Sequence, residues 1–154
     1  MTYNIHPIFV HFPVALLFLY SVIKILPLRK FFPKVFWKHI ERVLLVAGLL
    51  GACAAIYTGT IAKTLVQPDR ELVRAHITFA LSSTAVYSLL LFFEIIAVLR
   101  PKYLDLTNGK ISKLLALAGI ICISVTGMLG GVMVYGLSAD PLAGPLLKLL
   151  GIHL

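Results

Sequence analysis

Two histidines of this chain open matching stretches, and imidazole rings at matching places are candidates for holding a metal. His11 begins HFPVAL and His76 begins HITFAL, so both fit the pattern His-x-x-x-Ala-Leu. Each stretch leads into a long apolar segment, then through a basic loop into a second apolar segment rich in small residues. The pattern predicts two helical hairpins of common origin, with one histidine at the same place in each.

We expect His11 and His76 to be the metal ligands of a haem b, because two imidazoles facing a common axis suit bis-histidine ligation. In a parallel repeat the pseudo-two-fold axis stands along the membrane normal, which puts both rings at equal depth. The alternative is a pair of hydrogen-bonded interfacial histidines without a metal. The cofactor contacts predicted around the pair are His6, Tyr87, Gly127, Gly130 and Gly131.

These side chains must be positioned by helices that cross a membrane. The 154 residues are 60% hydrophobic and 13% charged, with a mean hydropathy of +0.98, whereas a soluble domain is about half apolar and about a quarter charged. About 20 apolar residues span a bilayer core as a helix. We therefore predict an all-α integral membrane protein, a four-helix bundle forming a single membrane domain over residues 1–154. The predicted spans are 8–26, 43–62, 75–99 and 114–137.

The charge distribution predicts how the chain is oriented. The net charge is +8, but its cations gather in the loops 27–42 and 100–113, and no basic groove interleaved with aromatic residues indicates nucleic-acid binding. Positive-inside bias puts these two loops in the cytoplasm and both chain ends outside. We therefore expect a multi-pass protein of the bacterial plasma (inner) membrane, with the histidine pair near the outer face.

Other chemistry has little support. Cys53 and Cys122 lie singly in apolar segments, where cysteine usually acts as a small packing residue. No Ser/His/Asp set, phosphate loop or pair of carboxylates is visible in the sequence. An enzyme that transforms a substrate is therefore not expected.

The third segment carries a polar stripe. Ser83, Tyr87 and Glu94 fall within about 20° of His76 around a helix, and such a stripe normally faces the interior of a bundle. Glu94 is expected to pair with Lys24 near the inner interface. Glycines such as Gly127 either allow close helix packing or leave room for a flat ligand.

The stretch HPIFVHFPVAL, residues 6–16, resembles the signature His-Pro-x-x-Val-His-Phe-Pro-x-Ala-Leu of a bacterial membrane family, domain of unknown function 2231. The stretch GMLGGVMVY, residues 127–135, is similar to the Gly-rich final helix of that family. The resemblance implies a four-helix membrane protein without an established activity. Some members are joined to c-type cytochrome or Rieske iron–sulfur domains, which implies a redox setting.

The hypothesis that joins these features is a small electron-transfer protein or redox-complex subunit, b-type cytochrome-like. Its partners would be the lipid bilayer and a quinone or a cytochrome or iron–sulfur protein, within a homo- or hetero-oligomer. Two alternatives remain: a small transporter or channel lined by the polar stripe, and a non-catalytic assembly or anchoring subunit of a membrane complex.

Overall fold

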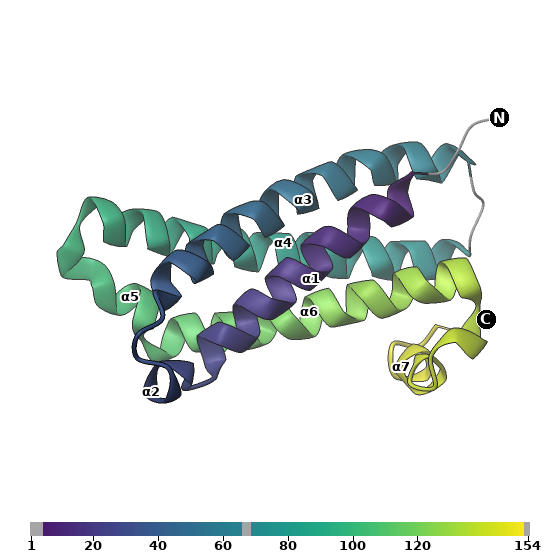
Figure 1. The fold of residues 1–154 in the computed structure, drawn as a ribbon. Coiled ribbons are helices and arrows are strands. Elements are labelled where there is room, and N and C mark those ends of the chain that lie inside the picture. Colours follow the sequence, from purple (N-terminus) through teal and green to yellow (C-terminus); the bar gives the residue numbers. More distant parts are fainter. Residues whose placement is uncertain (1–4, 66–68, 153–154) are drawn as a thin grey trace.

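The computed structural model describes residues 5–65 and 69–152 and consists of helices and turns, with no strand in those ranges. Four helices are long and apolar enough to cross a membrane (Figure 1). This confirms the predicted all-α fold and a multi-pass membrane protein. The four are α1 (His6–Ile25), α3 (Trp37–Leu65), α4 (Arg70–Leu99) and α6 (Lys110–Tyr135).

Short elements close the two ends of the bundle. At one end, which we call the basic end, lie the connections α1–α3 and α4–α6 (Figure 1). The opposite end, the histidine end, holds the start of α1, the start of α4 and the C-terminal segment. The short elements are α2 (Leu28–Phe31), η1 (Pro101–Tyr103) and α5 (Leu104–Asn108) at the basic end, and η2 (Leu137–Ala139) and α7 (Ala143–Leu149) at the histidine end.

Local sequence explains where the long helices begin and end. The carboxylate of Asp69 accepts hydrogen bonds from the backbone N–H groups of Glu71 and Leu72, and so caps the start of α4. Gly136 ends α6 with φ 76°, a left-handed conformation that glycine adopts without steric cost. All four helices begin before their predicted apolar segments, most of all α3, which starts at Trp37.

The four helices pack as a bundle whose outer surface is apolar. Helix α1 lies against α3 and α6, and α4 lies against α6 and α3, so α1 and α4 face each other diagonally across the interior. Only 28–33% of the residues in the most apolar part of each span are buried. Large side chains such as Phe12, Leu50 and Phe92 are more than half exposed. This outward apolar surface is suited to contact with lipid.

Contacts between helices repeat from one hairpin to the other. A Cβ added at Gly48 would lie 2.6 Å from Cδ2 of Leu17, and one added at Gly119 would lie 2.8 Å from Cζ of Tyr87. Leu17 and Tyr87 are both fully buried and stand 70 residues apart, while the two glycines stand 71 apart. The hairpins α1–α3 and α4–α6 are therefore equivalent, with α1 matching α4 and α3 matching α6.

Candidate functional site

His6 lies in the first turn of α1 and bonds across to α3. Its Nδ1 is 3.0 Å from the hydroxyl oxygen of Thr58. The ring packs on bare backbone, because a Cβ added at Gly59 would lie 3.1 Å from its Cε1. The Thr58 hydroxyl donates its own proton to the carbonyls of Ala54 and Ala55. It therefore accepts the bond from the imidazole N–H.

His76 has the same kind of environment in the second hairpin. Its Nδ1–H donates to the carbonyl of Thr126 on α6 at 3.0 Å. A Cβ added at Gly130 would lie 3.4 Å from its Cε1. His6 and His76 stand 70 residues apart, and Gly59 and Gly130 stand 71 apart, the same register that relates the buried core of the two hairpins. The second helix of each hairpin therefore holds the histidine ring through one hydrogen bond and one glycine contact.

The structure brings His6 and His76 together at the histidine end. His6 opens α1 and His76 lies in the second turn of α4, on the two helices that face each other diagonally. His11 lies elsewhere: its side chain is exposed, and its Nδ1–H donates to the Pro7 carbonyl within α1. His6 is therefore a second candidate to pair with His76, and His11 as a metal ligand stays a prediction.

The hydrogen bonds fix the chemistry of the two rings. A neutral imidazole that donates from Nδ1 carries its lone pair on Nε2. A metal-binding histidine usually donates its other ring N–H to a carbonyl or another acceptor, which orients the ring. His6 and His76 both show this arrangement. Within the described residues no group of three or more His, Cys, Asp or Glu side chains is placed to hold a metal ion.

The other predicted cofactor contacts are only partly near this pair. Gly130 meets the His76 ring, and a Cβ added at Gly127 would touch Val14 at 3.6 Å. Nothing lies within 4 Å of a Cβ added at Gly131, so that face of α6 is open. Tyr87 lies about 16 Å further along α4 than His76, at 1.5 Å rise per residue. As cofactor contacts these residues remain predictions.

Tyr87 belongs to a polar layer in the middle of the bundle. Its hydroxyl is 2.9 Å from that of Ser21 on α1. The rings of Tyr20 and Tyr87 meet edge to face, with centroids 6.1 Å apart. The Tyr20 hydroxyl is the one buried side-chain polar atom among the described residues without a hydrogen-bond partner. This layer joins α1 to α4 across the diagonal.

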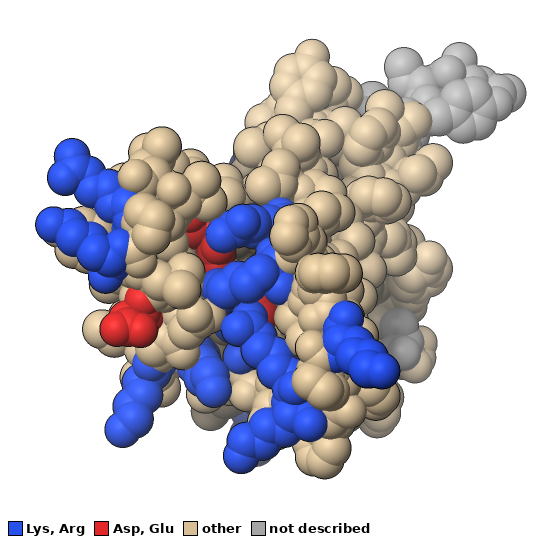
Figure 2. Space-filling model, turned by 60° about the vertical axis from the view of Figure 1, so that its left-hand side comes forward, with Lys and Arg blue, Asp and Glu red and all other residues tan. Residues whose placement is uncertain are grey.

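A buried ionic network, the basic-end network, joins the same two helices at the other end. Lys24 bonds Glu94 at 3.3 Å, which confirms the predicted pair. It also bonds Glu41 of α3 at 2.9 Å. Both carboxylates are at least 96% buried. Figure 2 shows Lys and Arg side chains gathered over partly covered acidic ones at this end. The remaining members are Arg29, Lys38 and Arg42.

Most of this network is not evident from the sequence. The pattern of charges assigns residues 27–42 to a loop, whereas α3 begins at Trp37 and its first turns carry Lys38, Glu41 and Arg42 into the network. The acid at Glu41, three residues after one lysine and next to an arginine, is the available signal, since an acid in a basic interfacial segment needs a partner.

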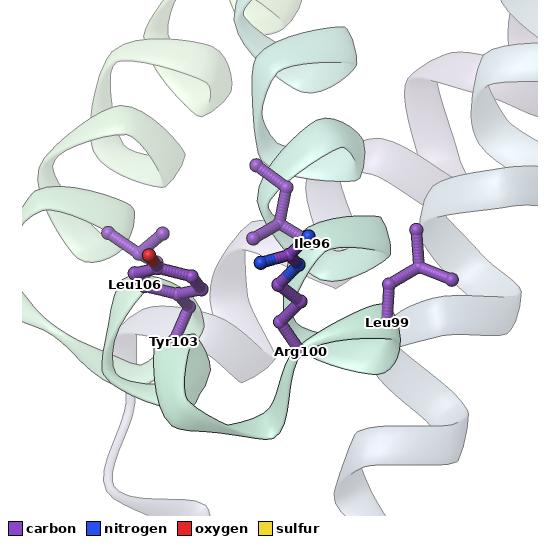
Figure 3. Close-up of a pocket in the computed structure, with 5 residues that line it drawn as sticks. All are labelled: Ile96, Leu99, Arg100, Tyr103 and Leu106. Atoms are coloured by element: carbon purple, nitrogen blue, oxygen red, sulfur yellow. The ribbon is translucent and has the colours of Figure 1, made fainter.

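An open apolar groove lies on the surface of the basic end, far from the histidines. Its volume is about 380 Å³, and Figure 3 shows the side chains that line it, from the end of α4, η1 and α5. They are Ile96, Leu99, Arg100, Tyr103 and Leu106.

The model of the family described as "Predicted membrane protein (DUF2231)" matches residues 2–139. The chain belongs to the DUF2231 family. This confirms the resemblance found in the HPIFVHFPVAL stretch, which spans both His6 and His11. No curated protein matches this DUF2231 chain. No solved structure matches it either.

Proposed function

We propose that this DUF2231 protein is a small membrane electron-transfer protein that holds a haem b between His6 and His76. The observation that carries the proposal is that both rings, at equivalent positions of α1 and α4, are held by the second helix of their own hairpin. Each is hydrogen-bonded through Nδ1 to that helix and packs on one of its glycines, the orientation that a metal-binding histidine usually has. The two rings come from α1 and α4, which face each other across the bundle.

The donor set suits an iron porphyrin. Bis-histidine ligation needs two neutral imidazoles and no other protein ligand, and the site offers two. A tetrahedral zinc site needs three or four protein ligands, which the described residues do not assemble. When bound, a haem supplies one-electron transfer at its iron.

The chain's own residues have three tasks in this proposal. His6 and His76 supply the ligand atoms. Thr58 and the Thr126 carbonyl orient the rings, and hydrogen bonding at Nδ1 raises their basicity as ligands. The surrounding apolar helices keep the site dry, which tunes a redox potential. No group in this set performs substrate chemistry, so the expected activity is exchange of electrons with a partner at the histidine end.

The absorption spectrum of the protein purified in detergent from haem-supplied bacterial cells tests the proposal. We expect a Soret band that shifts on reduction. The His6→Ala and His76→Ala variants should lose the band. The control variant His11→Ala, which replaces another histidine near the start of α1, should retain it. His76→Met should keep haem with a higher reduction potential, because methionine ligation raises it.

Each outcome has a meaning. A colourless wild-type protein overturns the haem proposal. Loss of the band in His11→Ala together with retention in His6→Ala returns the second ligand to His11. Size-exclusion profiles and thermal unfolding of each variant show whether a lost band reflects lost ligand or lost fold.

We further propose that the basic end faces the cytoplasm of a bacterial inner membrane. The cations of the α1–α3 and α4–α6 connections support this, because short cytoplasmic loops carry the excess of Lys and Arg. A periplasmic reporter such as alkaline phosphatase, fused after Leu154, should then be active. The same reporter fused in the α4–α6 connection should be inactive, and the reverse pattern contradicts the orientation.

A further inference from the structure

The groove at the basic end has the shape and lining of a lipid site. Ile96, Leu99 and Leu106 supply its apolar surface, and Leu99 is 74% exposed. The groove is open along the outside of the bundle, at the end of a membrane-spanning helix. A position there meets both acyl chains and headgroups of a bilayer leaflet.

One cation that lines this groove, the Arg100 side chain, forms no polar contact with the described part of the protein. The Arg100 guanidinium makes no hydrogen bond or ion pair with any described residue, and in Figure 3 it stands among the apolar lining. In contrast, Lys24, Lys38 and Arg42 are all engaged with buried carboxylates. Arg100 therefore has its donors available for a ligand.

The charges around Arg100 favour an anion. Lys102 lies over the ring of Tyr103 at 4.9 Å, beside the groove. Asp105, the one acid of the connection 100–113, is exposed and forms no ion pair with the described residues. A guanidinium binds phosphate through two parallel N–H donors. Basic sites next to membrane helices bind anionic lipid headgroups in this way.

We propose that this groove binds a phospholipid with an anionic headgroup. One acyl chain lies on the apolar side chains of Ile96, Leu99 and Leu106, and the headgroup phosphate contacts Arg100. The apolar side chains of the groove match the acyl chain of such a lipid. Arg100, which has no ion-pair partner among the described residues, matches its phosphate headgroup. This site is independent of the histidine end and of whether haem binds there.

Native mass spectrometry of the detergent-purified full chain tests the proposal. The probes are phosphatidylglycerol and phosphatidylcholine with identical acyl chains, titrated separately. We expect tighter binding of phosphatidylglycerol. Arg100→Gln should weaken phosphatidylglycerol binding about five- to tenfold, the effect of about one interfacial charge, and change phosphatidylcholine binding much less.

Two further variants separate a site from general attraction. Lys113→Gln removes one exposed cation of the connection 100–113 that forms no ion pair with a described residue, and it should change phosphatidylglycerol binding less than about twofold. Leu106→Trp fills the groove and should weaken both lipids. Equal effects of Arg100→Gln and Lys113→Gln, or no effect of Leu106→Trp, overturn the proposal, because the attraction would then be spread over the basic end.

Discussion

Lys24 and Glu94 occupy equivalent positions in the two hairpins and bond each other across the bundle. They stand 70 residues apart, as His6 and His76 do, and their side chains meet at 3.3 Å with at least 94% of each residue buried. Since a pseudo-two-fold axis relates α1 to α4, it passes between these side chains. Opposite charges at equivalent positions allow attraction where identical charges would repel.

In the basic-end network, removing an acidic side chain should lower the free energy of unfolding more than removing a basic one. The network holds four cations and two carboxylates. Glu94→Gln leaves Lys24, Lys38 and Arg42 with one carboxylate fewer, and should lower the free energy of unfolding by about 3 kcal/mol or more. Lys24→Met should cost only about 1 kcal/mol, because both carboxylates keep other partners.

Thermal or denaturant unfolding in detergent measures both changes. Lys34→Met serves as the control. Lys34 is a cation of the α1–α3 connection and has no ion-pair partner among the described residues, so its loss should change the free energy of unfolding by less than about 0.5 kcal/mol. If Lys24→Met proved costlier than Glu94→Gln, Lys24 would be the member on which the network depends.

Glycines of α6 differ sharply in the room beside them. A Cβ at Gly119 would lie 2.8 Å from Cζ of Tyr87, a ring that is fully buried and bonded to Ser21. Gly119→Ala should therefore destabilise the bundle by about 1–3 kcal/mol through overpacking. Gly131→Ala, on the same helix but with nothing within 4 Å, should be neutral or slightly stabilising, since alanine favours a helix. Unfolding of the two variants side by side makes the comparison, and equal effects would contradict this packing.

The two central tyrosines should respond differently to loss of their hydroxyl groups. Tyr87→Phe removes the bond to Ser21 and leaves that buried hydroxyl without its partner, at a cost of about 1 kcal/mol. Tyr20→Phe removes a hydroxyl that has no partner among the described residues and should be neutral or stabilising. Both variants keep the edge-to-face ring contact, so unfolding reports the hydroxyl alone. A larger loss in Tyr20→Phe than in Tyr87→Phe would show that the Tyr20 hydroxyl is satisfied.

The sequence predicts the four helices because membrane spans follow from the length of apolar segments. Their ends are less predictable, since charged residues can belong to a helix when they turn inward. Helix α3 shows this: its first turns carry Lys38, Glu41 and Arg42 into the basic-end network. Hydropathy alone assigns such residues to a loop.

The register of the repeat was harder to find from the sequence than the repeat itself. The shared pattern His-x-x-x-Ala-Leu pairs His11 with His76, 65 residues apart, whereas the packing pairs His6 with His76. The packing register is set by side chains that fill glycine positions in the partner helix. Gly48 and Gly59 are spaced as Gly119 and Gly130 are, so comparing these glycines gives the correct register.

The opposite charges of Lys24 and Glu94 make the two hairpins complementary and not interchangeable. Two copies of the N-terminal half would bring two ammonium groups together in a dry interior, and two copies of the C-terminal half would bring two carboxylates together. Produced as separate polypeptides, the halves should complement each other only as an unlike pair. With these charges the two hairpins fit together only with each other, and not each with a second copy of itself.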